Sequence, residues 1–241
     1  MKIEVISINE EIGAPYLNFS KAIGTTDIIT RSAGTDHIDM KYAKKIGIDI
    51  HSLKNYHINS TAEHYWNLLF RLMRPLNQKA GYELAGKTLL IIGKGKVGKL
   101  LAKQAKAFGL RVLTYDIIDG QTKKDLNALL GIAQVIFLCV PLTKKTKNIL
   151  DVKEFTLMKE KPFIVNAART KLIDLDAAEF AIKRKYIKGY AIDDKVQHRI
   201  NGYEQENKFV SCGRHMGART IEAQEKADEE IKQIREKIQN E

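Results

Sequence analysis

The stretch "LLIIGKGKVGKLL" at residues 89–101 decides the fold class of this chain. Four apolar residues lead into Gly93, Gly95 and Gly98, and an amphipathic helical pattern begins within the same motif. In such a turn the first glycine permits the tight bend, the second lets the backbone approach a pyrophosphate, and the third lets the helix pack closely on the strand. The helix N-terminus favours the anion. The motif predicts a dinucleotide site, although a strand–turn–helix without a ligand would carry the same glycines.

An acidic residue at the end of the following strand strengthens this prediction. Asp116 closes the apolar run "RVLTYD" and lies 18 residues after Gly98, close to the ~20-residue spacing of dinucleotide-binding folds. A carboxylate there accepts a hydrogen bond from a ribose 2′-hydroxyl and repels a 2′-phosphate. We therefore expect NAD rather than NADP, although the lysines of the glycine loop weaken that preference slightly.

Apolar runs alternate with helical patterns from residue 87 onward. Strands that are apolar throughout and are separated by helices form parallel sheets covered on both faces. Right-handed crossovers then favour a doubly wound α/β (Rossmann) fold. The predicted strands are 87–93, 111–116, 134–141, 162–168, 187–193 and 208–213, and the predicted helices are 97–108, 123–131, 151–159 and 174–185.

A different, smaller region precedes the glycine motif. Apolar patterning predicts strands at 1–8, 27–34 and 48–52 and a helix at 39–47. The segment "STAEHYWNLLFRLMRPL" (60–76) begins with a Ser-x-x-Glu capping box at Ser60 and is apolar on a helical period. Pro75 should end or kink this helix.

These patterns predict two domains. The C-terminal stretch from Thr220 is a charged amphipathic helix with one stripe of isoleucines. We expect residues 1–62, completed by the helix at 219–241, to form the smaller lobe. Residues 63–218 should form the nucleotide-binding domain.

Composition narrows the function classes. The 241 residues are 44% hydrophobic and carry a formal net charge of +11. No apolar run approaches the ~20 residues of a membrane helix. The lysines are scattered, and neither zinc-ligand spacing nor an RNA-binding signature appears, so we expect no metal and no nucleic-acid partner. The two cysteines, Cys139 and Cys212, lie in apolar runs and read as free thiols of a cytoplasmic protein.

Several further motifs follow one another along the chain, namely "TRSAGTDHID" (30–39), "STAEH" (60–64), "CVPLTKKT" (139–146), "FIVNAARTKLID" (163–174), "GYAID" (189–193) and "HMGARTIEAQ" (215–224). Together with the glycine loop, they make the chain resemble the NAD-dependent D-2-hydroxyacid dehydrogenase family, and "TRSAGTDHID" looks most like the D-lactate dehydrogenase branch. The resemblance runs from about residue 27 to the C-terminus. It implies a Rossmann domain beside a flavodoxin-like lobe, and a homodimer formed through the nucleotide domain.

The resemblance also implies roles for individual residues. Arg169 corresponds to the arginine that grips the substrate carboxylate, and His215 corresponds to the acid/base histidine. The backbone at Ala33 and Gly34 would hold the carboxylate. Each has a simpler interpretation, since Arg169 alone could be a surface arginine and His215 alone a loop histidine. The cofactor-lining positions would be Gly93, Gly95, Lys96, Val97, Gly98, Asp116, Val140, Pro141, Thr146, Ala167 and Asp193. The remaining histidines with ordinary surroundings are interpreted as structural or exposed, namely His37, His51, His57 and His64.

The chain departs from the family pattern in several ways; for example, the usual Arg-Gly is Arg169-Thr170 here. The family's glutamate partner of the histidine would fall at residue 198, where this chain has His198. Sequence alone leaves Asp194, Glu204 and Glu206 open as substitutes. The usual Thr-Pro before the histidine is Gly213-Arg214. The N-terminal lobe is also expected to be short, because 30 residues precede Arg31, about one strand–helix unit.

Three functions therefore compete. The first is an oxidoreductase that transfers a hydride between NAD(H) and a small D-2-hydroxy or 2-keto acid. The second is a catalytically impaired NAD-binding regulatory protein, similar to corepressor relatives of the family. The third, and the weakest, is a nucleic-acid-binding protein that uses the positive charge.

Overall fold

The computed structural model describes residues 2–7, 11–78 and 80–240, which form two compact units. The terminal unit contains Met1–His57 and Ala218–Glu241, and the central unit contains Ile58–Gly217. Each unit has its own apolar core. Residues from both ends of the chain therefore build the first unit, and one continuous segment builds the second.

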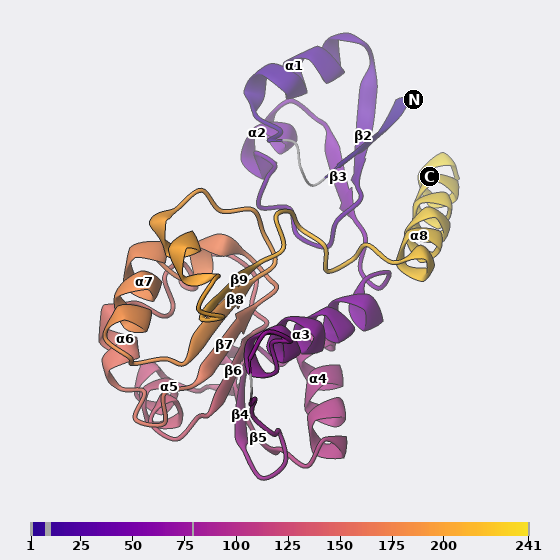
Figure 1. Ribbon diagram of the computed structural model, residues 1–241. Helices are drawn as coiled ribbons and strands as arrows, with labels where there is room; N and C mark the ends of the chain where they lie inside the picture. The colour runs from indigo at the N-terminus through magenta and orange to yellow at the C-terminus, as the bar shows by residue number, and fades with distance from the viewer. Residues whose placement is uncertain (1, 8–10, 79, 241) are drawn as a thin grey trace. The chain divides into compact units, whose positions relative to one another are not determined.

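The terminal unit is a three-stranded parallel sheet with helices (Figure 1). Its strand order is β1-β2-β3. Parts of the predicted strand at 1–8 lie outside the described residues. The helix α1 was not predicted; it begins after a glycine N-cap, with proline in its first turn. The elements are β1 (Lys2–Ile6), α1 (Ala14–Ala22), β2 (Thr25–Thr30), α2 (Met40–Lys45), β3 (Asp49–Ser52) and α8 (Ile221–Gln239).

Helix α8 supplies one core of the terminal unit. Its residues Ala227 and Ile231 are buried in the same cluster as Ile29 and Leu53. Glu230 fixes this packing, because its two carboxylate oxygens accept the backbone N–H groups of residues 54 and 55 at 2.7 and 2.9 Å. The C-terminal helix is thus an integral layer of this unit.

The central unit is a doubly wound sheet of six parallel strands in the order β5-β4-β6-β7-β8-β9. The change of direction lies between β4 and β6, where parallel α/β sheets bind ligands beyond the carboxyl ends of their strands. The α/β class predicted from the sequence is confirmed. The strands are β4 (Thr88–Ile92), β5 (Arg111–Tyr115), β6 (Val135–Leu138), β7 (Phe163–Asn166), β8 (Gly189–Ile192) and β9 (Phe209–Ser211).

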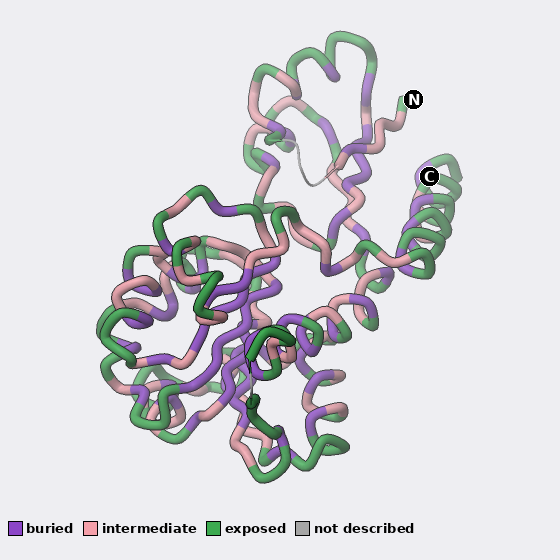
Figure 2. Tube along the Cα trace, viewed as in Figure 1, coloured by how far each residue is buried: buried purple, intermediate pink, exposed green. Residues whose placement is uncertain are grey.

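Helices cover both faces of this sheet (Figure 1). One face packs on α3 and α4, and the other packs on α5, α6 and α7. Figure 2 shows that burial is concentrated in the strands, as expected for a sheet covered on both sides. The helices are α3 (Ile58–Met73), α4 (Lys96–Ala107), α5 (Lys123–Leu130), α6 (Val152–Thr156) and α7 (Leu175–Lys183), and three 3₁₀ turns are η1 (Ile117–Asp119), η2 (Thr170–Leu172) and η3 (Arg199–Tyr203).

The start of α3 differs from the sequence prediction. The predicted capping box at Ser60 is wrong, because the helix already begins at Ile58. The Ser60 hydroxyl instead donates a hydrogen bond to the carbonyl oxygen of Gly217. A tertiary partner outcompetes the local cap. The helix ends at Met73, two residues before Pro75, as expected from the restriction that proline places on the preceding residue.

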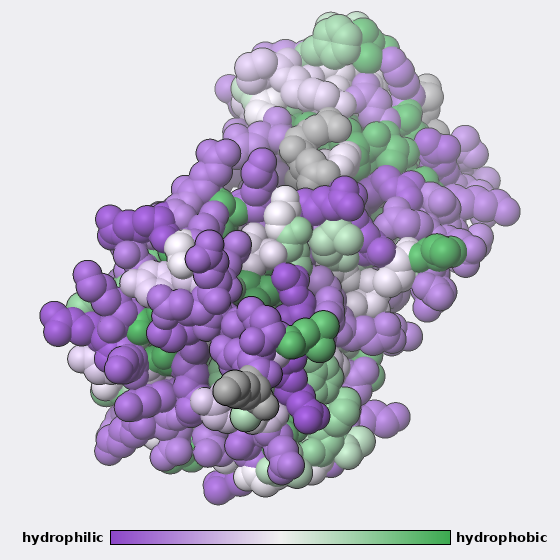
Figure 3. Space-filling model, in the orientation of Figure 1, coloured by the Kyte–Doolittle hydropathy of each residue, from purple (hydrophilic) through white to green (hydrophobic). Residues whose placement is uncertain are grey.

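The face of the molecule seen in Figure 3 is mainly polar: hydrophilic side chains dominate it, and the apolar ones are scattered. Among the described residues, none of the helices combines the length and the apolar character that crossing a bilayer requires.

Candidate active site

The glycine loop joins β4 to α4 and places its three glycines in different environments. Gly93 has φ +109°, and its N–H donates to the Tyr115 carbonyl at 2.7 Å. A Cβ at Gly98 would lie 2.1 Å from the Gly93 carbonyl oxygen, whereas a Cβ at Gly95 would have no neighbour within 4 Å. Gly98 therefore serves close packing, and Gly95 faces open space at the N-cap of α4. This is the arrangement that a pyrophosphate cradle requires.

Replacing Gly98 with alanine should lower the free energy of unfolding by about 3 kcal/mol, because the new methyl group overlaps the Gly93 carbonyl. Urea denaturation followed by circular dichroism measures this. Gly95→Ala is the matched control: its free energy of unfolding should stay within about 1 kcal/mol of the parent, while NADH binding weakens. Equal destabilisation by the two substitutions would contradict the assignment of Gly98 to packing.

Asp116 is fixed at the end of β5. Its Oδ2 accepts the Lys94 N–H at 2.7 Å, and its Oδ1 accepts the Ile118 N–H at 3.0 Å. The Lys94 ammonium pairs with Asp119 at 2.6 Å. Lys94 of the glycine loop is thereby paired with Asp119. Its positive charge therefore weakens the preference of Asp116 for NAD over NADP less than the sequence suggested.

The other predicted cofactor residues follow the carboxyl ends of neighbouring strands. Thr146 holds the loop after β6, because its hydroxyl donates to the Pro141 carbonyl at 2.6 Å and accepts the Thr143 N–H at 2.8 Å. These positions therefore meet at one edge of the sheet. The remaining ones are Lys96 and Val97 in the first turn of α4, Val140 after β6, Ala167 after β7 and Asp193 after β8.

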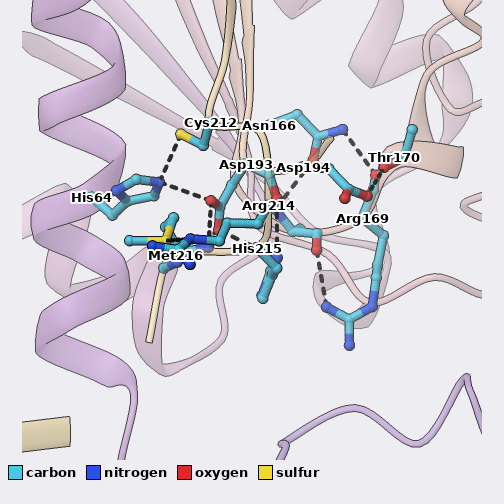
Figure 4. A network of polar contacts seen from close by, with 12 residues as sticks. His64, Asn166, Arg169, Thr170, Asp193, Asp194, Cys212, Arg214, His215 and Met216 are labelled. Atoms are coloured by element: carbon cyan, nitrogen blue, oxygen red, sulfur yellow. Dashed lines mark hydrogen bonds and ion pairs between the residues drawn. The ribbon is translucent and has the colours of Figure 1, made fainter. Parts of the chain in front are cut away.

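Asp193 is the centre of a buried polar network (Figure 4). Its side chain is 1% exposed. Oδ1 accepts the Met216 N–H at 2.7 Å, and Oδ2 accepts the Gly217 N–H at 2.7 Å. Burial alone would raise the pKa of Asp193, but the hydrogen bond from His64 and the positive charges of His215 and His64 lower it below its usual value. The group is therefore a stable carboxylate.

His215 contacts this carboxylate. Its Nδ1 lies 3.1 Å from the backbone oxygen of Asp193 and 3.3 Å from Oδ2. The contact settles which carboxylate reaches His215. None of the three open substitutes forms an ion pair or hydrogen bond with it among the described residues, since Asp194 accepts from the Thr170 hydroxyl and Glu206 pairs with Lys208. The third candidate, Glu204, borders a groove beside the end of α3.

His64, which the sequence interpretation took as structural or exposed, contacts the Asp193 carboxylate. It lies on α3, and its Nε2 is 3.0 Å from Asp193 Oδ1 and 3.5 Å from Cys212 Sγ. Burial lowers its pKa, but the hydrogen bonds to Asp193 and Cys212 and the charge of Asp193 raise it to about 9. Its spacing was a usable signal: Ser60 and His64, one helical turn apart on an apolar helix, both contact the segment 193–217.

Arg169 follows β7, one strand away from Asp193. It is half-buried, and its Nη1 donates to the Ala168 carbonyl at 2.9 Å (Figure 4). Its backbone oxygen accepts the Asn166 side-chain amide at 2.9 Å, which fixes the turn. Ala33 and Gly34 lie in the loop after β2 of the terminal unit, where the Ser32 hydroxyl donates to the Gly34 carbonyl at 2.7 Å. His198, at the family's glutamate position, instead contacts Asp176 at 3.2 Å.

The model of the D-isomer-specific 2-hydroxyacid dehydrogenase NAD-binding domain matches residues 51–214. This chain belongs to that family. Its glycine loop and Asp116 therefore lie within an NAD-binding domain, and NAD is the cofactor that the sequence predicted.

The dehydrogenase family includes relatives with several substrates. The chain is 34% identical to a glycerate dehydrogenase of Methylorubrum extorquens over 69% of this chain and 59% of that protein. It is 30% identical to the D-3-phosphoglycerate dehydrogenase of Bacillus subtilis over 86% of this chain and 44% of that protein. The chain thus spans about half the length of these two curated relatives.

A solved dehydrogenase structure resembles this chain over almost its whole length. The D-lactate dehydrogenase of Aquifex aeolicus, complexed with NAD and lactic acid, superposes with a TM-score of 0.84 and 26% identity. The match covers 99% of this chain and 83% of that structure. Membership of the family and the α/β fold are therefore supported by sequence and by structure.

Proposed function

We propose that this chain interconverts a small D-2-hydroxy acid and the corresponding 2-keto acid with NAD(H). The observation that carries the proposal is the contact of His215 with the buried Asp193, at the same strand edge as the glycine loop. An imidazole oriented by a carboxylate is suited to exchange a proton with a substrate oxygen. The cofactor supplies the hydride chemistry when bound.

The hydrogen-bond pattern of His215 supports a specific proton path. Both groups facing its Nδ1, the backbone oxygen and Oδ2 of Asp193, are acceptors. Nδ1 therefore carries a hydrogen, and Nε2 is left to exchange a proton. In reduction, Nε2–H of the imidazolium donates to the oxygen that was the carbonyl. In oxidation, the neutral Nε2 accepts the hydroxyl proton.

Arg169 is assigned to the substrate carboxylate. A guanidinium makes two parallel hydrogen bonds to a carboxylate, which fixes orientation as well as position. Its place after β7 puts it at the strand edge that also carries Asp193. A role for the backbone of Ala33 and Gly34 in holding this carboxylate stays a prediction of the family resemblance.

A screen of NADH oxidation with pyruvate, glyoxylate, hydroxypyruvate and bulkier keto acids tests the proposal. Turnover of at least one of them is expected, with NADH consumed in proportion to the acid reduced. NADH binding without turnover of any keto acid would overturn the enzymatic proposal and favour the regulatory alternative. That alternative is supported by His198, which replaces the family's glutamate and contacts Asp176 instead of His215.

NADH should bind at least about tenfold more tightly than NADPH, because the fixed Asp116 carboxylate repels a 2′-phosphate; tenfold corresponds to about 1.4 kcal/mol. Titration followed by NADH and NADPH fluorescence measures the ratio. In Asp116→Ala the ratio should approach one, because the repulsion is removed. Equal or tighter NADPH binding by the parent protein would mean that the lysines of the glycine loop override Asp116.

The finer features of the family resemblance stay predictions. The preference of the D-lactate branch for small keto acids depends on the keto-acid screen. The homodimer through the nucleotide domain depends on a measurement of mass in solution by sedimentation equilibrium.

A further inference from the structure

A histidine, an aspartate and a cysteine converge next to His215 (Figure 4). Nε2 of His64 lies 3.0 Å from Oδ1 of Asp193 and 3.5 Å from Sγ of Cys212. The three donor atoms all lie within 4.8 Å of one another. They come from α3 and from the ends of β8 and β9, three elements packed in one core. Cys212 has no role in the proposed hydride transfer, so its position beside His64 and Asp193 points to a different role.

We propose that His64, Asp193 and Cys212 form a Zn²⁺ site. A thiolate, an imidazole and a carboxylate are the ligand types that zinc prefers, at about 2.3, 2.0 and 2.0–2.2 Å. In a tetrahedral site those bond lengths separate sulfur from nitrogen by about 3.5 Å and nitrogen from oxygen by about 3.3 Å. The structure has 3.5 and 3.0 Å. For these two pairs, a change of about 0.3 Å or less would let an ion replace the proton on Nε2 of His64, and Sγ of Cys212 lies within 4.8 Å of the Asp193 carboxylate.

Hydrogen bonds from the backbone already fix the orientation of the Asp193 carboxylate, as is usual for a carboxylate that binds a metal. Oδ1 and Oδ2 of Asp193 accept the backbone N–H groups of residues 216 and 217, both at 2.7 Å. Hydrogen-bond partners of this kind orient a ligating carboxylate, and their removal typically weakens metal binding. The side chains of His64 and Asp193 are only 12% and 1% exposed. The ligands therefore bring little conformational entropy to be lost on binding.

One further side chain, that of Arg71, faces the sulfur. On coordination the Cys212 thiol and His64 each release a proton to solvent. Arg71 Nη1 lies 3.9 Å from Cys212 Sγ and can pair with the thiolate. Three protein ligands leave the fourth tetrahedral position to water, the pattern of an open zinc site.

A second group of donors on the surface is the main competitor. Asp176, Glu179 and His198 also lie within 4.8 Å of one another. However, Arg199 already pairs with both carboxylates of that group. A cation there would have to displace a guanidinium, so we place the zinc site at His64, Asp193 and Cys212.

Zinc at this site would also act on the proposed reaction. Asp193 is the carboxylate that holds Nδ1 of His215, and a bound ion would withdraw its negative charge from the imidazole. We expect Zn²⁺ to inhibit turnover; this second part rests on the proposed function, whereas metal binding does not.

Cobalt(II) and zinc binding to the full chain test the site, after the protein has been stripped with chelator. One Co²⁺ per chain should bind and give a thiolate-to-cobalt charge-transfer absorption band, which Zn²⁺ removes. Zn²⁺ should protect one of the two thiols from alkylation, and peptide mass spectrometry should identify it as Cys212. In Cys212→Ser the charge-transfer band should disappear, and in His64→Gln the affinity for Zn²⁺ should fall at least about tenfold, about 1.4 kcal/mol.

Two matched variants locate the ion. Cys139→Ala removes the other thiol, whose pKa burial raises to about 12, and should keep the band. His198→Gln should also keep it. Circular dichroism confirms that each variant is folded. Cobalt binding without a charge-transfer band, or binding lost in His198→Gln and kept in Cys212→Ser, would overturn the proposed site.

Activity measurements distinguish the zinc site from the proposed dehydrogenase function. If the chain turns over a keto acid, Zn²⁺ should inhibit the parent and Cys139→Ala but not Cys212→Ser. Equal inhibition of all three would overturn the inhibitory role. If no keto acid is turned over, the proposed function fails, while the spectra and the alkylation pattern still decide the metal site.

Discussion

Arg169→Ala should lower kcat/KM for the best 2-keto acid by roughly 100- to 5000-fold, which corresponds to about 3–5 kcal/mol. The reason is that the guanidinium is assigned to the substrate carboxylate, and truncation leaves that charge without its partner. The dissociation constant of NADH should change less than about threefold, because the cofactor cradle is built from other strand ends. Steady-state kinetics and fluorescence titration measure the two quantities separately.

Two further arginine variants make this test specific. Arg169→Lys should also be poor, since an ammonium cannot form two parallel hydrogen bonds with a carboxylate. Arg184→Ala is the matched control, because this arginine follows α7 and stacks on Phe180 with its guanidinium 5.6 Å from the ring centre. It should leave kcat/KM within about twofold. Normal kcat/KM in Arg169→Ala would mean that another cation holds the substrate.

His215→Gln should reduce kcat about 100- to 10,000-fold, the usual contribution of a positioned acid or base. Glutamine can donate a hydrogen bond to Asp193, but it cannot deliver or take a proton near neutral pH. NADH binding should be retained. Single-turnover measurements with saturating NADH and keto acid would show the loss in the chemical step itself.

The control for this variant is His198→Gln. His198 occupies the family's glutamate position but contacts Asp176, so its loss should change kcat by less than about twofold. A loss equal to that of His215→Gln would show that His198 takes part in proton transfer. Asp193→Asn is a less clear test, because both carboxylate oxygens accept backbone N–H groups and an amide NH₂ would face one of them.

Much of the central unit could be predicted from the sequence. Its strands are apolar throughout and are bounded by glycine, proline or charged residues, so residues 88–92 and 135–138 were covered by predicted strands. Helix α1 was missed because its signal is weak: its N-cap glycine offers no side-chain hydrogen bond. The start of α3 was misplaced because the Ser60 hydroxyl bonds to Gly217, 157 residues away.

The candidate active site could also be predicted only where it depends on local sequence. Glycine spacing and the position of Asp116 depend on local geometry, which a sequence displays. The partner of His215 depends on which side chain faces it after folding. Counting along the chain led to His198, whereas Asp193, five residues earlier, points its carboxylate at the imidazole. The contact of His64 with Asp193 spans 129 residues, and only the packing of α3 on the sheet produces it.

The division of the terminal unit between the two ends of the chain has a consequence for biosynthesis. Ile29 and Leu53 are covered by Ala227 and Ile231 of α8, and the 160 residues of the central unit, Ile58–Gly217, are translated in between. At about 5–20 residues per second, this interval lasts roughly 8–32 s. Throughout it the nascent sheet presents an uncovered apolar face, while the central unit can already fold behind it. Chaperones that recognise apolar strands should therefore engage the ribosome-bound chain through residues 25–56 and leave when residues 221–239 emerge.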